Sequence, residues 1–216
     1  MSVTARYAQL YEAIEAELRS CGRAPGSVTL VGAAKKQPLQ RIREAIEAGL
    51  RDVGESRLQE AQRVLPELPP VRAHFIGHVQ TNKAKGIAAL FDVVQSVDRI
   101  EAGLALAKAA ATLGRVLPVL IQVNVSAAER FGCPPEEAPS LAQRLRAEPS
   151  LRVDGVMAMA PFDPERVEAA FDAAAKTFAR VGGSTLSIGM SGDWREAVRA
   201  GSTMVRIGTA LFGERV

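Results

Sequence analysis

Short apolar runs and longer amphipathic stretches alternate along the chain. In residues 5–19, Leu10, Ile14 and Leu18 recur at helical spacing with glutamates between them, and this spacing predicts an amphipathic leading helix. Eight strand-like runs follow it, at residues 27–35, 51–56, 72–78, 92–97, 116–125, 151–160, 184–190 and 203–208. Helical patterns lie between them, at residues 39–48, in the stretch that ends at 64, and at 82–90, 100–113, 136–147, 164–180 and 194–200.

This alternation is typical of a parallel sheet covered by helices. Eight repeats predict an α/β fold, a single (β/α)8 TIM barrel with an extra N-terminal helix, in which residues 1–216 form one domain. An open, doubly wound sheet is the alternative, because the same alternation permits it. In both architectures, ligands bind at the carboxyl ends of the strands.

Composition narrows the class of protein. The 216 residues include 27 Lys and Arg against 24 Asp and Glu, and 47% are hydrophobic, so we expect a packed core rather than a disordered chain. No apolar run is long enough for a membrane span and no signal peptide is evident, which predicts a soluble, cytoplasmic protein. Cys21 and Cys133 lack metal or disulfide spacing, and we expect neither to carry chemistry. Dispersed cations and 5% aromatic residues argue against a nucleic-acid partner.

The strand ends are rich in small residues, amides and cations. They carry Lys35, Lys36, residues 54–56 and 78–80, Asn124, Met157, Met159 and residues 189–191 and 206–209. The last two loops join strand to helix through glycines, which leaves backbone N–H groups near the hydroxyls of Ser191, Ser202 or Thr209 and predicts a phosphate site. The alternative is that Ser191 only caps the next helix and Gly208 only turns the chain.

Lys35 ends an apolar run and is a candidate nucleophile. Partial desolvation there would lower the pKa of its amine and free the neutral form to build a Schiff base with a carbonyl. The alternative is an ordinary lysine that reaches water. Lys36 follows directly, and on a strand the two side chains would point to opposite faces. Periodicity therefore leaves the choice between them open.

Arg206 closes the eighth run on the same face as Met204. Its guanidinium could pair with a phosphate or donate to a ring nitrogen, and the alternative is an ion pair with a carboxylate at the barrel rim. His74 and His78 are four residues apart, which on a strand separates them by about 13 Å. That distance is too long for both to chelate one ion, so we predict no metal site.

Seven motifs occur in order and carry a family resemblance. They are GAAKKQP, VGESRLQEA, HFIGHVQTNK, VNVS, GVMAMAP, LSIGMSGD and AGSTMVRIGTALFGER. Together, from about Val28 to Arg215, they resemble the pyridoxal phosphate homeostasis protein family. The resemblance implies a barrel similar to the N-terminal domain of alanine racemase, which holds pyridoxal 5′-phosphate (PLP) as an internal aldimine.

The resemblance also assigns roles to individual residues. Counted back from Pro38, the Schiff-base lysine falls on Lys35 rather than Lys36. The phosphate ligands fall on Ser191 with the neighbouring backbone at Met190, and on Gly208 and Thr209. Arg206 matches an arginine that faces the pyridine nitrogen. Two positions depart from the family pattern, which commonly has asparagine in place of Ser56 and often has a basic residue in place of Phe131.

The implied function is to hold and buffer PLP in vitamin B6 homeostasis, without established catalytic turnover. PLP-dependent apoenzymes are the expected recipients, and the expected state is a monomer. Alanine racemase uses a tyrosine from a second domain, whereas this chain ends at Val216 and its tyrosines, Tyr7 and Tyr11, fall in the leading helix. The alternative is a PLP-dependent enzyme that acts on a small amino acid through Lys35 alone.

Overall fold

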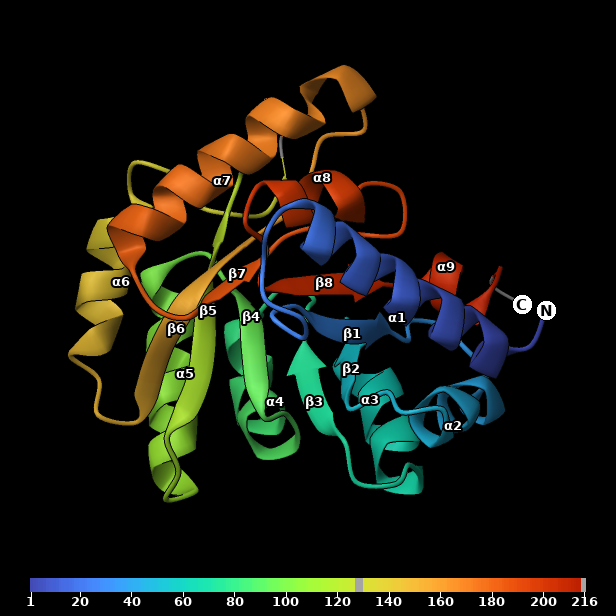
Figure 1. Ribbon diagram of the computed structural model, residues 1–216. Coiled ribbons are helices and arrows are strands. Elements are labelled where there is room, and N and C mark those ends of the chain that lie inside the picture. The colour runs from blue at the N-terminus through green and yellow to red at the C-terminus, as the bar shows by residue number, and fades with distance from the viewer. Residues whose placement is uncertain (127–129, 215–216) are drawn as a thin grey trace.

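The computed structural model describes residues 1–126 and 130–214; Arg215, where the family resemblance ends, lies outside them. Within these residues eight parallel strands close a barrel in chain order, and β8 pairs with β1 (Figure 1). The strands are β1 (Thr29–Ala33), β2 (Asp52–Glu55), β3 (Arg72–Phe75), β4 (Val93–Val97), β5 (Leu117–Val123), β6 (Leu151–Ala158), β7 (Thr185–Ser187) and β8 (Met204–Ile207). The predicted barrel is confirmed, and the open sheet is wrong.

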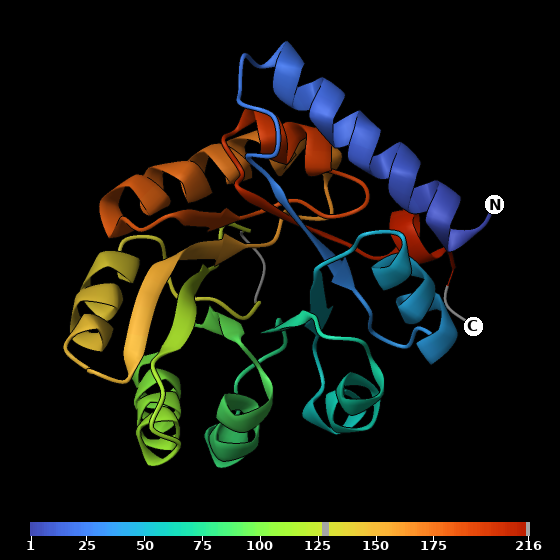
Figure 2. The same cartoon turned by 60° about the horizontal axis from the view of Figure 1, so that its bottom comes forward.

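The helices surround the strands (Figure 2). They are α1 (Val3–Ser20), α2 (Leu39–Glu47), α3 (Leu58–Val64), α4 (Ala84–Leu90), α5 (Ile100–Thr112), α6 (Ala138–Arg146), α7 (Val167–Val181), α8 (Trp194–Arg199) and α9 (Thr209–Phe212). Short 3-10 turns, η1 (Leu65–Glu67), η2 (Thr81–Lys83) and η3 (Pro164–Arg166), precede or follow three of them. None of the helices described is long and apolar enough to span a membrane.

Several strands are shorter than their apolar runs, because local backbone geometry ends them. β1 ends at Ala33, since the next residues close a turn in which the Gln37 N–H donates to the Ala34 carbonyl at 2.8 Å. β7 ends at Ser187, and Gly189 just beyond it has a φ of +99°, a conformation that favours glycine and is incompatible with an extended strand. Residues that follow these ends belong to loops at the barrel mouth.

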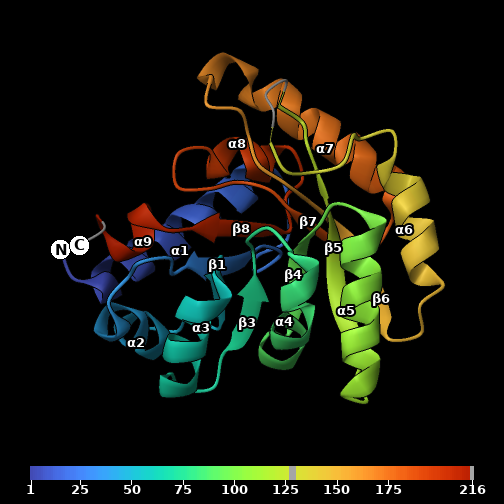
Figure 3. The same ribbon diagram turned by 180° about the vertical axis from the view of Figure 1, so that it is seen from behind.

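Two separate groups of buried side chains form the core. One joins β1, β2 and β8 to α1, α2, α8 and α9, and we call this part the β8–β1–β2 half. The other joins β3–β7 to α3–α7, and we call it the β3–β7 half. Figure 3 shows α3, α4 and α5 in a row outside the strands of this second group.

The extra helix α1 belongs to the first group. Its buried residues Val3, Leu10, Ile14 and Leu18 form one face, as the helical spacing predicts. This face packs against α2, α8 and α9, and α1 is outermost there in Figure 2. Because α8 and α9 begin at the loops after β7 and β8, α1 supports the predicted phosphate site from behind.

Candidate functional site

Lys35 lies in the turn after β1 rather than on the strand. The alternation of side chains along a strand therefore does not apply to Lys35 and Lys36. The expectation that they point to opposite faces of a strand is wrong. Lys36 takes a φ of +57° and is exposed, whereas Lys35 is half-buried. A φ in this region is uncommon for a residue other than glycine. The turn thus gives the two lysines different surroundings, and Lys35 is the less exposed residue of the two.

Ser191 links the loops that follow β7 and β8. Its hydroxyl oxygen accepts hydrogen bonds from the backbone N–H groups of Gly208 and Ala210, each at 3.3 Å. The alternative, that Ser191 caps the helix after it, is wrong: the N-cap of α8 is Asp193, whose side chain makes no capping hydrogen bond to that helix. Ser191 instead binds the start of α9, so two backbone donors converge on one oxygen.

Gly208 and Thr209 lie beside the end of β1. A Cβ added at Gly208 would lie 3.4 Å from the Ala33 carbonyl oxygen, which is ordinary contact, and the φ of Gly208 is −105°. Gly208 therefore needs no conformation that only glycine can adopt. Thr209 is exposed as the first residue of α9. Since Lys35 comes two residues after Ala33, the loop after β8 and the lysine turn are neighbours.

Met190 has a different environment from the other predicted ligands. Its backbone N–H donates to the Asp193 carboxylate at 2.5 Å, and its side chain is 37% exposed. The carboxylate thus occupies this N–H group within the loop after β7. What Met190 presents at the mouth is its apolar side chain.

Arg206 is buried in the barrel, with 4% of its surface exposed. Its Nη1 donates to the Ser187 carbonyl at 2.7 Å and to the Ser187 hydroxyl at 2.6 Å, and its Nη2 donates to the Ala158 carbonyl at 2.8 Å. These bonds replace the rim ion pair considered as the alternative. Burial lowers the pKa of the guanidinium to about 10, opposed by the Asp193 carboxylate, so Arg206 stays cationic at neutral pH.

Glu55 is a buried group that the sequence argument named only as part of a loop. It ends β2 with 2% exposure, and its Oε2 has no hydrogen-bond partner among the described residues. Burial, helped by the nearby Glu60 carboxylate, raises the pKa of this carboxyl to about 7, and the Ser56 backbone N–H and Lys35 oppose the change. A buried acidic residue at the end of an apolar strand is the pattern that could have identified it.

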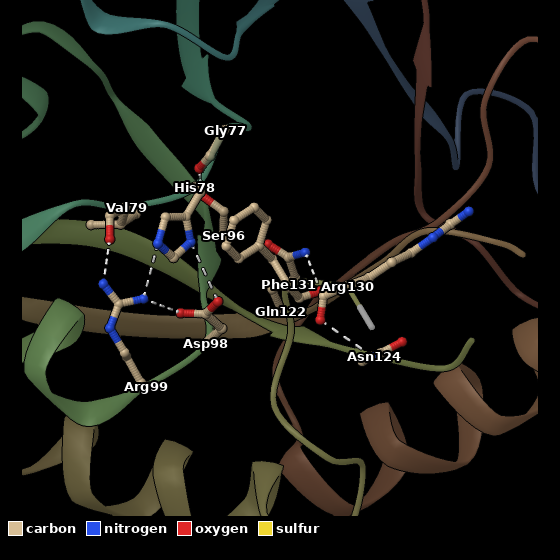
Figure 4. Close-up of polar contacts among 10 residues, drawn as sticks. All are labelled: Gly77, His78, Val79, Ser96, Asp98, Arg99, Gln122, Asn124, Arg130 and Phe131. Atoms are coloured by element: carbon tan, nitrogen blue, oxygen red, sulfur yellow. Dashed lines mark hydrogen bonds and ion pairs between the residues drawn. The ribbon is translucent and has the colours of Figure 1, made fainter. Parts of the chain in front are cut away.

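The opposite rim carries an interlocked set of side chains at the ends of β3, β4 and β5 (Figure 4). The rings of His78 and Phe131 stack with centroids 3.9 Å apart and an 18° angle between planes. His78 Nδ1 lies 3.6 Å from Asp98 Oδ2, and Arg99 binds Asp98 at 2.9 Å and the Val79 carbonyl at 2.8 Å. Phe131, which departs from the family pattern, therefore packs on a histidine of this rim.

Side-chain amides anchor the segment that carries Phe131. Gln122 donates to the Phe131 carbonyl at 2.9 Å, and Asn124 donates to the Arg130 carbonyl at 3.4 Å (Figure 4). The guanidinium of Arg130 in turn lies 4.1 Å from the ring centroid of Phe162. The sequence analysis named residues 78–80 and Asn124 as strand-end residues but missed the contacts of this rim, because they join residues that follow three different strands.

The two histidines and the two cysteines lie apart from one another. His74 binds Asp52 at 2.8 Å inside the barrel, whereas His78 is at the rim. No cluster of three or more His, Cys, Asp or Glu that could hold a metal occurs in the residues described. Cys21 and Cys133 are free thiols, and burial raises the pKa of the Cys133 thiol to about 12.

Comparisons with known proteins show which family the chain resembles. The family described as alanine racemase, N-terminal domain, matches residues 12–216. The pyridoxal phosphate homeostasis protein of Pseudomonas aeruginosa is 41% identical over 99% of this chain and 96% of its own length. The protein of the same name from Escherichia coli is 37% identical over 96% of this chain and 94% of its own length.

Solved structures resemble the whole barrel. PipY of Synechococcus elongatus, in a structure with PLP bound, has a TM-score of 0.84 at 33% identity and covers 98% of this chain and 100% of its own. Alanine racemase of Clostridium difficile has a TM-score of 0.74 at 13% identity, over 94% of this chain and 56% of its own, and shares the fold alone. By its similarity to these relatives along almost its full length, the chain belongs to the pyridoxal phosphate homeostasis protein family.

Proposed function

We propose that this protein binds PLP at the mouth of the β8–β1–β2 half, holds it through Lys35 and releases it again. The observation that carries the proposal is the contact between the loop after β8 and the end of β1, which brings a phosphate-type loop next to a half-buried lysine. PLP carries both an aldehyde and a phosphate. The PLP-bound structure of PipY supports the same ligand here.

Ser191, Gly208 and Thr209 are the proposed phosphate ligands, with the Met190 segment beside them. Backbone N–H groups that converge on one oxygen suit a phosphate, because each can donate to the anion. The Gly208 and Ala210 N–H groups already converge in this way on Ser191 Oγ. The position after strands seven and eight is also where barrels of this type commonly bind phosphate.

Lys35 is the proposed covalent anchor. Its neutral amine would attack the aldehyde carbon, form a carbon–nitrogen double bond and release the aldehyde oxygen as water. The reverse reaction with water or another amine frees the cofactor, so the linkage is reversible. Lys36, with its exposed side chain, is not part of the proposed site.

Arg206 is the proposed partner of the ring nitrogen. When bound, PLP supplies an electron sink that depends on protonation of that nitrogen. A cationic guanidinium opposite the nitrogen disfavours its protonation, because two positive charges would then face each other. An arginine at this position thus favours holding the cofactor over using it in carbanion chemistry.

The proposed role is to buffer PLP in the cytoplasm, as a monomer, and to deliver it to PLP-dependent apoenzymes. Residues 1–216 act in this proposal as one barrel domain. Tyr7 and Tyr11 stack on each other on α1, outside the barrel, so neither supplies a second base at the mouth. The alternative function is turnover of a small amino acid by the protein loaded with PLP. The proton-exchange experiment below is designed to detect it.

Borohydride trapping tests the covalent anchor. The protein loaded with PLP should absorb in the band of a lysine-bound cofactor, and reduction followed by peptide mapping should locate the label on Lys35. Lys35→Ala should abolish the label, and Lys36→Ala should keep it. A reducible label that persists in Lys35→Ala would overturn the assignment.

Proton exchange tests the non-enzymatic role. The loaded protein is incubated with a panel of amino acids in deuterated water, and loss of each α-proton is followed by NMR. We expect no exchange above the rate of free PLP. Rapid exchange that disappears in Lys35→Ala would establish an enzyme instead.

A further inference from the structure

A continuous chain of buried polar side chains crosses the barrel interior. It runs from Asp52 on β2 through His74 on β3, Gln95 on β4 and Ser187 on β7 to Arg206 on β8. The successive distances are 2.8 Å from Asp52 to His74, 2.9 Å from His74 to Gln95, 2.7 Å from Gln95 to Ser187 and 2.6 Å from Ser187 to Arg206. β2, β3 and β4 are neighbours in the barrel, and so are β7 and β8. The bond between Gln95 and Ser187 therefore crosses the interior from β4 to β7.

With the Gln95 amide oriented as in this structure, the hydrogens of these bonds all point the same way. Arg206 can only donate, so the Ser187 oxygen accepts from it and Ser187 gives its own proton to Gln95 Oε1. The Gln95 Nε2 group then donates to His74 Nδ1, and His74 donates from Nε2 to Asp52. In this arrangement the His74 ring carries its hydrogen on Nε2 and accepts at Nδ1.

This series of hydrogen bonds therefore has the Arg206 guanidinium at one end and the Asp52 carboxylate at the other, with uncharged groups between them. His74, Gln95 and Ser187 are fully buried, and a polar group in such a place is costly unless it is bonded. The second Nε2 hydrogen of Gln95 has a partner too, since Nε2 lies 3.2 Å from the sulfur of Met204. Each aligned bond polarises the next, which strengthens the whole series.

We propose that His74 and Gln95 are positioning residues for Arg206, and that the chain from Asp52 fixes the guanidinium in the orientation that faces the bound cofactor. This inference rests on the proposed function, because it assigns Arg206 to the cofactor ring. The mechanism is local: with Gln95 accepting its proton, Ser187 must turn a lone pair to Arg206. Without Gln95, the hydroxyl can rotate and the guanidinium loses a directed acceptor.

The first test needs no cofactor. The ring nitrogens of His74 in the ligand-free protein are observed by 15N NMR at neutral pH, where we expect the neutral Nε2–H form. A charged His74, or one with its proton on Nδ1, would contradict the proposed direction of the hydrogen bonds from Asp52 to Arg206. This measurement on the unmodified protein stands even if a variant does not fold.

The second test uses PLP titration of folded variants. His74→Leu and Gln95→Leu break the chain and should weaken PLP binding roughly 3- to 10-fold, with a shifted absorption maximum of bound PLP. His74→Gln keeps one donor and one acceptor and should fall between His74→Leu and the unmodified protein. Val93→Ala is the control, because Val93 is buried on β4, two residues before Gln95 and on the same face.

Different failures have different meanings. Loss of PLP binding in the unmodified protein would contradict the proposed function, whatever the state of His74. If the unmodified protein binds PLP and both leucine variants match Val93→Ala in affinity and absorption maximum, the positioning role of the chain is wrong.

Discussion

At the carboxyl ends of its strands, the β8–β1–β2 half presents backbone N–H groups near Lys35 and Arg206, whereas the β3–β7 half presents interlocked side chains. In the first half, Ser191 receives the N–H groups of Gly208 and Ala210. In the second, the His78 ring stacks on Phe131 (Figure 4). A site built from backbone depends on how the helices behind it are held, while a rim built from side chains depends on the identity of those side chains.

This contrast explains the place of α1 in the fold. The helix buries its apolar face on α8 and α9, which begin at the two loops proposed to bind phosphate. No corresponding extra helix covers the β3–β7 half among the residues described. The backbone-built site thus has a third layer behind it.

The largest expected effect is the loss of stability when a buried leucine is shortened, and its consequence for PLP binding should differ between the two cores. Leu18→Ala on α1 and Leu145→Ala on α6 each remove a fully buried leucine, and each should lower the free energy of unfolding by about 2–5 kcal/mol. Only Leu18→Ala should also weaken PLP binding, because it loosens the support of α8 and α9. Urea unfolding and PLP titration measure the two quantities, and equal losses of affinity in both variants would contradict the comparison.

A smaller effect concerns pH. Because the pKa of Glu55 is raised to about 7 in the folded state from 4.5, the folded protein retains a proton that the unfolded chain has lost between these values. Glu55 therefore reduces stability by about 1–3 kcal/mol as pH rises through this window. Glu55→Gln should be more stable than the unmodified protein at pH 8 and equal to it at pH 4.5.

Asp98→Asn is the matched control for this pH effect. It removes a carboxylate from the other rim, where Asp98 pairs with Arg99 at 2.9 Å, and should leave the pH-dependent loss of stability in place. Unfolding is followed by denaturant titration at several pH values. A loss that persists in Glu55→Gln would show that another group causes it.

The smallest effect compares two hydroxyl groups, one from each half of the barrel. Ser191→Ala removes a group proposed to touch the phosphate and should weaken PLP binding roughly 2- to 10-fold. Ser96→Ala removes a hydroxyl of the β3–β7 half that donates to the Gly77 carbonyl, and should leave PLP affinity unchanged. Titration of both variants decides the point, and an equal loss in Ser96→Ala would place the ligand across both halves.

Much of the candidate site was predictable from local sequence. The glycine-rich loops after the last two strands and the lysine after the first are contiguous motifs, and the family resemblance assigned Lys35 and Arg206 directly. The bonds of Ser191 were not predictable, because its partners follow the next strand. The sequence placed Lys35 on a strand, whereas it lies in the turn that ends β1. A backbone hydrogen bond closes that turn, and side-chain periodicity does not report it.

By itself, the sequence determined the alternation of strands and helices, the amphipathic face of α1 and the loops that could bind phosphate, because these depend on spacing within short segments. Only the tertiary structure decided that Asp52, His74, Gln95, Ser187 and Arg206 form one chain. Their positions span more than 150 residues, from 52 to 206. They meet because closure of the barrel brings β8 back to β1 and turns one side chain from each of five strands inward.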